Sequence, residues 1–188
     1  MTIILISTVL FGCGKSNNTE SKSWNERRQK MEYSFSEYSE KIPLITLPLT
    51  ATCEKELEGS KFRFTDKEIS KYGRDNCCIY GKLADTEKYT AIIYLYPADW
   101  VLPIIETTDK KGNKISELEL FEGFCGEDIN CWGTSWFKID KDLSIQLNDS
   151  SIGFDRDSKD EIIETTKKTT VKHRQFYIND NGKIVERK

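Results

Sequence analysis

Three short turns with β-prone segments on both sides constrain the fold of this chain more than any other feature of its sequence. The turns are centred near residues 111, 141 and 181, and each contains aspartate. Two of them also contain glycine, which accepts the positive φ of a tight turn. A short turn pairs its two strands antiparallel. The three units are spaced too irregularly for a solenoid or a propeller, so they predict an antiparallel meander.

The segments around these turns differ in how strongly they are expected to be buried. Segment 88–97 is the densest in β-branched and aromatic residues and is apolar on both faces, which predicts a central strand. Segment 143–148 alternates apolar and polar residues, which predicts a half-buried strand. Segment 148–161 has neither the alternation of a strand nor the spacing of a helix, so we expect a mobile excursion there.

The part of the chain before the first turn contributes a helix and an extended segment. Apolar residues recur at helical spacing over residues 24–41, which predicts an amphipathic helix. Residues 42–52 contain Pro43 and Pro48, which cannot donate ladder hydrogen bonds, so this segment should be an edge strand or a strap. The predicted fold is mainly β: a single antiparallel meander sheet or barrel-like domain with an N-terminal amphipathic helix on one face.

The first thirteen residues indicate the cellular location of the protein rather than its fold. Residues 3–11 form an apolar run of signal-peptide length, too short to span a membrane. The run ends in Leu10-Phe11-Gly12-Cys13, which resembles the lipobox of bacterial lipoproteins. That resemblance implies cleavage before Cys13, lipidation of its sulfur and attachment to a membrane of the bacterial envelope, facing the periplasm or the exterior. We therefore expect a signal peptide at 1–12, a lipidated cysteine and tether at 13–23, and one mainly β domain at 24–188.

The remainder of the chain is similar to uncharacterised lipoproteins of Gram-negative bacteria. The similarity rests on the lipobox, on the proline-bounded sequence IPLITLPL at 42–49, and on YGKL at 80–83 followed by KGNKI at 111–115. These families imply a cellular compartment and no assigned activity.

Charge and composition restrict the partners. Charged residues make up 31% of the chain, their signs are interspersed, and the net charge is −3. This pattern argues against a nucleic-acid-binding surface. Aromatic residues at 11% indicate a packed fold rather than disorder. We expect a monomer that contacts a membrane through the lipid on Cys13 and binds a protein or glycan ligand.

Five cysteines remain after Cys13, in a compartment that favours disulfides. Cys125 and Cys131 bracket a short polar loop, so we expect them to be bridged. Cys53 should pair with Cys77 or Cys78. Only one of these two can face Cys53, because neighbouring strand residues point to opposite faces. The cysteine spacings match none of the usual structural-zinc patterns, so no metal or cofactor is predicted.

Motifs of catalysis are missing from the sequence. It contains no nucleophile elbow, P-loop, zinc-protease or dinucleotide motif. The one histidine, His173, lies in a charged segment and should be at the surface. We predict no catalytic residues and a protein that is not an enzyme. An envelope hydrolase that uses clustered carboxylates such as Glu127 and Asp128 is an alternative.

Loop 121–135 is the strongest candidate for a binding surface. It carries Phe124 and Trp132 beside Glu127 and Asp128, and apolar anchors rimmed by charge are typical of interfaces. The competing interpretation is that its aromatic residues close the end of the core; for Tyr94 and Trp136, in the neighbouring strands, burial in the core is the expectation. The predicted function is ligand binding by an anchored lipoprotein. An inhibitor or immunity-type lipoprotein that acts on a protein partner is a further alternative.

Overall fold

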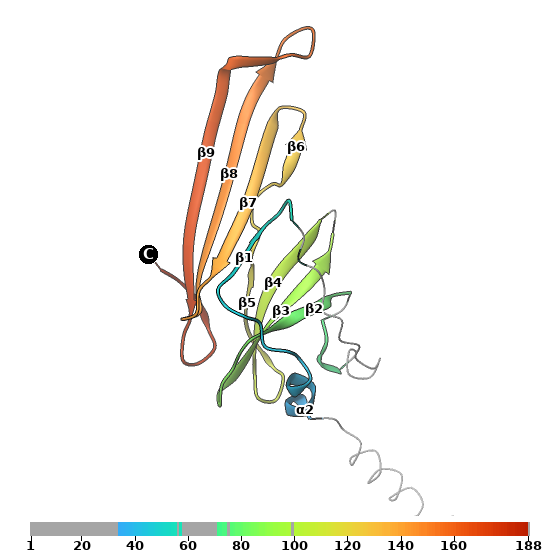
Figure 1. Cartoon of the computed structure of the whole chain (residues 1–188), viewed down its shortest axis with the longest axis vertical. Coiled ribbons are helices and arrows are strands. Elements are labelled where there is room, and N and C mark those ends of the chain that lie inside the picture. The colour runs from blue at the N-terminus through green and yellow to red at the C-terminus, as the bar shows by residue number, and fades with distance from the viewer. Residues whose placement is uncertain (1–33, 56, 58–70, 75, 99, 188) are drawn as a thin grey trace, which may run out of the picture. The chain divides into compact units, whose positions relative to one another are not determined.

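The computed structural model describes residues 34–55, 57, 71–74, 76–98 and 100–187, which form a mainly β domain. The strands are arranged in two antiparallel sheets, one of four strands and one of six (Figure 1). The prediction of a mainly β antiparallel fold is confirmed. The prediction of a single sheet or barrel is wrong, because the chain leaves one sheet after its first strand and returns after the other is complete.

The four-stranded sheet is a meander in the order β2-β3-β4-β5. Its β3 lies between β2 and β4 and is buried over its first seven residues, as the apolar faces of segment 88–97 predict. Gly112 has φ of 88° in the turn between β4 and β5, where other residues would be strained. The strands are β2 (Cys78–Asp85), β3 (Tyr89–Pro97), β4 (Val101–Asp109) and β5 (Lys114–Glu119).

The six-stranded sheet has the order β1-β7-β8-β9-β10, with β6 paired to the far end of β7. Its two longest strands, β8 and β9, have 13 and 17 residues. The mobile excursion predicted for 148–161 is wrong, because β8 continues to Arg156 with β7 and β9 as partners on its two sides. The strands are β1 (Leu49–Thr52), β6 (Gly126–Asp128), β7 (Cys131–Ile139), β8 (Ser144–Arg156), β9 (Ile162–Ile178) and β10 (Ile184–Arg187).

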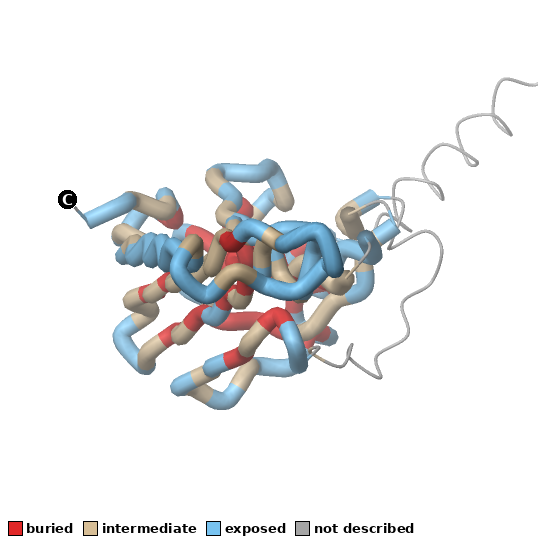
Figure 2. The backbone as a smooth tube through the Cα atoms, turned by 90° about the horizontal axis from the view of Figure 1, so that it is seen from above, coloured by how far each residue is buried: buried red, intermediate tan, exposed pale blue. Residues whose placement is uncertain are grey.

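The main core lies between the two sheets. It joins β3 residues such as Ile93 to β7 and β8 residues such as Phe137 and Leu147. On the other face of the four-stranded sheet, Ile92 and Tyr94 pack with Phe35 and Tyr38 in a second cluster. Successive β3 side chains therefore serve two cores, which explains why this strand is apolar on both faces. In Figure 2 many buried positions lie toward the middle of the view, and exposed segments lie around them and in front of them.

The helix of the second cluster is shorter than predicted. Helix α2 (Phe35–Glu40) begins after Ser34, whose backbone is extended and whose side chain completes a capping box with Glu37. The prediction of one continuous helix over 24–41 is therefore wrong at Ser34. Buried Lys82 fixes the helix to β2: its Nζ donates to Ser39 O at 2.9 Å and to Asp85 Oδ2 at 2.7 Å.

The extended segment after α2 connects the two sheets, and it ends in an edge strand, as its prolines predict. Ile45 N donates to Lys82 O and Lys82 N donates to Pro43 O, both at 2.8 Å, so the segment first lies along β2. It then becomes β1, the edge strand beside β7. The lipobox, Cys13 and residues 24–33 lie outside the described residues. Within the described part, no helix is long and apolar enough to cross a membrane.

Candidate binding cleft beside Trp132

The six-stranded sheet extends past the four-stranded sheet, whose strands have at most nine residues (Figure 1). The extension consists of the beginning of β7, the end of β8 and the beginning of β9. The main core includes β8 residues Ile145 and Leu147 but none of the described residues beyond Leu147 on that strand. We call the face with these two side chains the core face and the opposite one the outer face. The next four residues of β8, 148–151, are polar on both faces, so the main core does not continue along this part of the strand.

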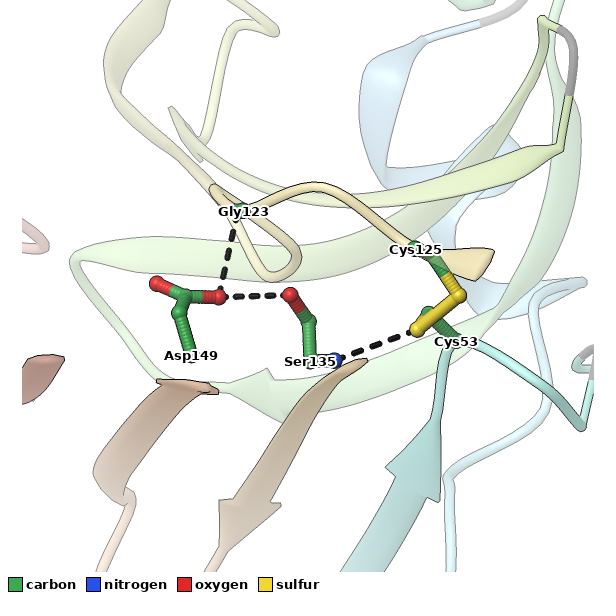
Figure 3. The surroundings of a disulfide bond; sticks show 5 residues. All are labelled: Cys53, Gly123, Cys125, Ser135 and Asp149. Carbon is green, nitrogen blue, oxygen red and sulfur yellow. Dashed lines mark hydrogen bonds between the residues drawn. A yellow bond between two sulfur atoms is a disulfide. The ribbon is translucent and has the colours of Figure 1, made fainter. Parts of the chain in front are cut away.

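A clamped loop, residues 121–125, covers the core face just beyond the core. The structure joins Cys125 to Cys53, at the end of β1, by a disulfide with Cα atoms 6.0 Å apart (Figure 3). Ser135 on β7 contacts the same bridge, because its N–H donates to Cys53 Sγ at 3.1 Å. The bridge spans 72 residues of sequence and ties the loop to the first strand of the sheet.

This bridge corrects both predicted pairings. Cys77, Cys78 and Cys131 are free thiols. Gly126 faces Gly133 in the β6–β7 ladder, so Cys125 lies three positions from Cys131 along the ladder, about 10 Å. That distance exceeds the Cα separation of about 7 Å that a disulfide can span. Cys78 belongs to β2 in the other sheet and does not meet Cys53.

Asp149 on β8 attaches the clamped loop to the sheet by hydrogen bonds. Its Oδ1 accepts hydrogen bonds from Gly123 N at 3.1 Å and from Ser135 Oγ at 2.6 Å (Figure 3). The contact is too close for a side chain at position 123, since a Cβ there would lie 2.7 Å from that oxygen. A Cβ on Gly133 would lie 2.6 Å from Phe124 O. The two glycines therefore let the loop lie directly on the sheet.

Glu122 adds an electrostatic attachment to β9. Its carboxylate pairs with Arg174 and, at 3.1 Å, with Lys172 Nζ. Burial alone would raise the pKa of Glu122, but the hydrogen bonds and charges of Arg174 and Lys172 outweigh burial and lower it. Arg174 also pairs with Glu186 on β10 at 2.7 Å. The loop is thus attached to β1, β7, β8 and β9, and it is a fixed part of the sheet.

On the outer face, the same part of the sheet forms a shallow cleft, which we call the Trp132 cleft. It has a volume of about 270 Å³. Trp132 stands in one cross-strand row, with Glu127 of β6 on one side and Ile152 of β8 on the other. Its side chain is 38% exposed. The cleft is lined by Glu127, Trp132, Ile152, Phe154, Ile162 and Lys167.

Arg156 fixes the two turns at the end of the cleft. Its Nε donates to Ile129 O at 2.8 Å in the β6–β7 turn, and its Nη1 donates to Asp160 O at 3.0 Å in the β8–β9 turn. The guanidinium lies over the Phe154 ring, 5.3 Å from its centroid, and pairs with Glu127 at 3.3 Å. A planar guanidinium with several fixed donors keeps both turns in place.

The structure divides the four predicted binding residues between two faces. Trp132 and Glu127 share the outer face because they are direct partners in the β6–β7 ladder. Asp128 is paired with Cys131, and Phe124 contacts Gly133, so both belong to the core face. The predicted single surface is therefore wrong, and only Trp132 and Glu127 belong to the cleft.

The residues that β8 and β9 contribute to the cleft were not among the predicted binding residues. Ile152 and Phe154 lie in segment 148–161, which was predicted to be mobile, and Ile162 follows it directly. The spacing of Ile152 and Phe154 by two residues is a strand pattern that could have revealed them. Of the expected core aromatics, Tyr94 is buried, whereas Trp136 is 36% exposed, so that expectation is wrong for Trp136.

In the described part of the chain, few titratable side chains line the Trp132 cleft. Glu127 is the only carboxylate that lines the cleft there, and it is paired with Arg156. His173 is exposed and contacts Asn148 at 2.7 Å. No group of three or more His, Cys, Asp or Glu side chains in the described part of the chain is placed to hold a metal ion.

Comparisons with known proteins add no assignment to this geometry. No protein-family model, no curated protein and no solved structure matches this chain. Any inference about function therefore depends on the residues of the site.

Proposed function

We propose that this chain is a lipid-anchored binding protein of the bacterial envelope, without enzymatic activity, that captures its ligand in the Trp132 cleft. The observation that carries the proposal is a half-exposed tryptophan in an apolar cleft on a rigid sheet extension. Trp is the residue type most enriched at binding hot spots. The lipobox ending at Cys13 supports the anchor and the compartment.

The cleft combines features that suit an exposed ring or an apolar side chain of a ligand. Its apolar lining includes Phe154 and Ile152, and Glu127 and Lys167 add one charge of each sign. Apolar surface with a few polar groups gives both affinity and orientation. The turns are already fixed by Arg156, so little ordering entropy is lost on binding. A protein segment or a glycan could present the matching group.

Trp132→Ala tests this proposal, with Trp136→Ala as the matched control. Both tryptophans lie on β7, face the outer side of the sheet and are exposed to a similar extent, but Trp136 lies outside the cleft. We expect Trp132→Ala to reduce capture of envelope components by the tethered full chain at least about tenfold, which corresponds to about 1.4 kcal/mol. Trp136→Ala should retain capture.

Thermal unfolding of both variants completes the test. The midpoints should stay close to that of the wild type, because neither side chain is in the core. A loss of about 3–5 kcal/mol for Trp132→Ala would identify it as a packing residue instead. Equal capture by all three proteins would contradict the proposal directly.

An inhibitor of a protein partner is a second candidate, favoured by Ile129. This side chain is 77% exposed in the turn that Arg156 fixes. An exposed apolar residue on a rigid turn suits insertion into a partner's pocket. In the same capture experiment, an inhibitor of this kind should lose its partner with Ile129→Ala and keep it with Trp132→Ala.

A further inference from the structure

Strand β9 has a long edge without a strand partner in the described residues. It pairs with β8 along most of its length, but β10 pairs only with its last part, Gln175 to Ile178 (Figure 1). From Lys168 to Arg174 the β8 ladder is regular and no described strand lies on the other side of β9. A regular unpaired edge presents a row of backbone donors and acceptors.

The turn into β10 shows which residues present those groups. Asn179 N donates to Lys183 O at 3.0 Å, so the backbone N–H of residue 179 points toward β10. Backbone groups alternate sides along a strand, and every second residue back from 179 therefore faces the same edge. Beyond the end of β10 these residues are Thr169, Val171 and His173.

The side chains beside this edge differ between the two faces. Lys168, Lys172 and Arg174 lie on the core face and Val171 lies on the outer face, where it is 66% exposed. Of these three basic residues, Lys172 and Arg174 form ion pairs with Glu122. Among the described residues, no carboxylate pairs with Lys168 within 4 Å.

This charge pattern decides between two possible occupants of the edge. A second copy of β9 paired antiparallel would place lysines opposite lysines or arginine, which destabilises cross-strand pairs. An added strand with acidic side chains on the core face would instead place carboxylates opposite Lys168 and Lys172. Apolar or hydroxyl side chains on its outer face would pair with Thr169 and Val171.

We propose that the edge of β9 from Lys168 to Arg174 is a second binding site, which accepts an extended acidic protein segment as an additional strand. Main-chain hydrogen bonds to Thr169, Val171 and His173 would provide affinity, and alternate carboxylates would provide register. This site is separate from the Trp132 cleft. The opposing interpretation is that the lysines only protect the edge from unwanted pairing.

The probe is a short capped peptide in which Glu alternates with Thr and Val, and its control carries Lys in place of Glu. Binding to the isotope-labelled full chain is followed by amide hydrogen exchange. We expect the acidic peptide to slow exchange at Thr169, Val171 and His173 by at least about tenfold. Exchange at residues 170 and 172, already bonded to β8, should change little. The effect should weaken as salt is added.

Two variants make the result specific. Val171→Pro removes one donor on the free edge, a position where proline is tolerated, and should abolish peptide binding while leaving capture by the Trp132 cleft intact. Val171→Ala keeps the donor and should bind within a few-fold of the wild type. Lys168→Glu should weaken the acidic peptide and favour the lysine peptide, which provides a second test if Val171→Pro fails to fold.

Three outcomes would overturn the proposal. If the acidic peptide leaves exchange on β9 unchanged, the lysines serve only to protect the edge. Both peptides could protect the edge equally, which would remove the charge argument. Peptide binding by folded Val171→Pro at wild-type strength would show that the main-chain groups of the edge are not used.

Discussion

At the residue scale, ion pairs placed where the loop meets the sheet contribute more than their exposed counterparts. The Glu122 side chain is 20% exposed and is shared by Arg174 and Lys172. These partners lower its pKa below that of the unfolded chain, against the effect of burial. A carboxyl with a lowered folded pKa stabilises the fold at pH values above its unfolded pKa, and this stabilisation is lost as the pH falls through the folded pKa.

Glu122→Gln should therefore lower stability near neutral pH and have little effect in acid. We expect a loss of about 1–2 kcal/mol at about pH 7 that shrinks toward zero near about pH 3. Urea unfolding at the two pH values measures the difference. Glu119→Gln is the control, because Glu119 is exposed on β5 and has no ion pair among the described residues. Equal losses at both pH values would mean that packing, rather than charge, attaches Glu122.

At the element scale, local patterns predicted most strands and missed the contacts between distant ones. The hairpins β4–β5 and β9–β10 follow from turns whose glycines, Gly112 and Gly182, have positive φ. The pairing of β1 with β7 joins segments far apart in the sequence, and no local pattern specifies such a partner. The Trp132 cleft has the same origin, because β6, β7, β8 and β9 each contribute to it.

The disulfide shows how strongly this long-range pairing matters. A bridge between Cys125 and Cys131 would close a short loop and stabilise by about 2 kcal/mol in the chain-entropy model. The observed Cys53–Cys125 bridge spans 72 residues, for which the same model gives about 4 kcal/mol. The observed bridge also fixes the clamped loop to the sheet edge at β1, an attachment that a Cys125–Cys131 bridge would not provide.

Replacing both bridged cysteines by serine should accordingly destabilise the domain by about 2–5 kcal/mol. Denaturant unfolding of the double variant measures the loss, and Cys131→Ser provides the matched control, since Cys131 is a free thiol in the same region. A double variant as stable as the wild type, or a Cys131→Ser variant equally destabilised, would contradict the observed pairing.

At the scale of the whole molecule, the domain has a helix on one side of two stacked sheets, and both proposed binding surfaces lie on the extended sheet. The main core ends near Leu147, and the part of the sheet beyond it is held by the disulfide, Asp149 and Arg156. A surface held by cross-links and ion pairs, rather than by a second layer, stays open on its outer face. This arrangement suits a protein that is tethered at Cys13 and makes contacts with its far strands.

The proposed anchor and the observed cysteine pairing give one joint prediction for protein isolated from its native membrane. Its N-terminal residue should be Cys13, carrying diacylglycerol, and peptide mapping under non-reducing conditions should find Cys53 joined to Cys125. Exposed Cys78 should be alkylated in the folded protein. Cys77 should react more slowly, because burial raises the pKa of its thiol despite the nearby Arg74 charge. An unlipidated N-terminus upstream of Cys13 would remove the anchor and leave the binding surfaces to act in another setting.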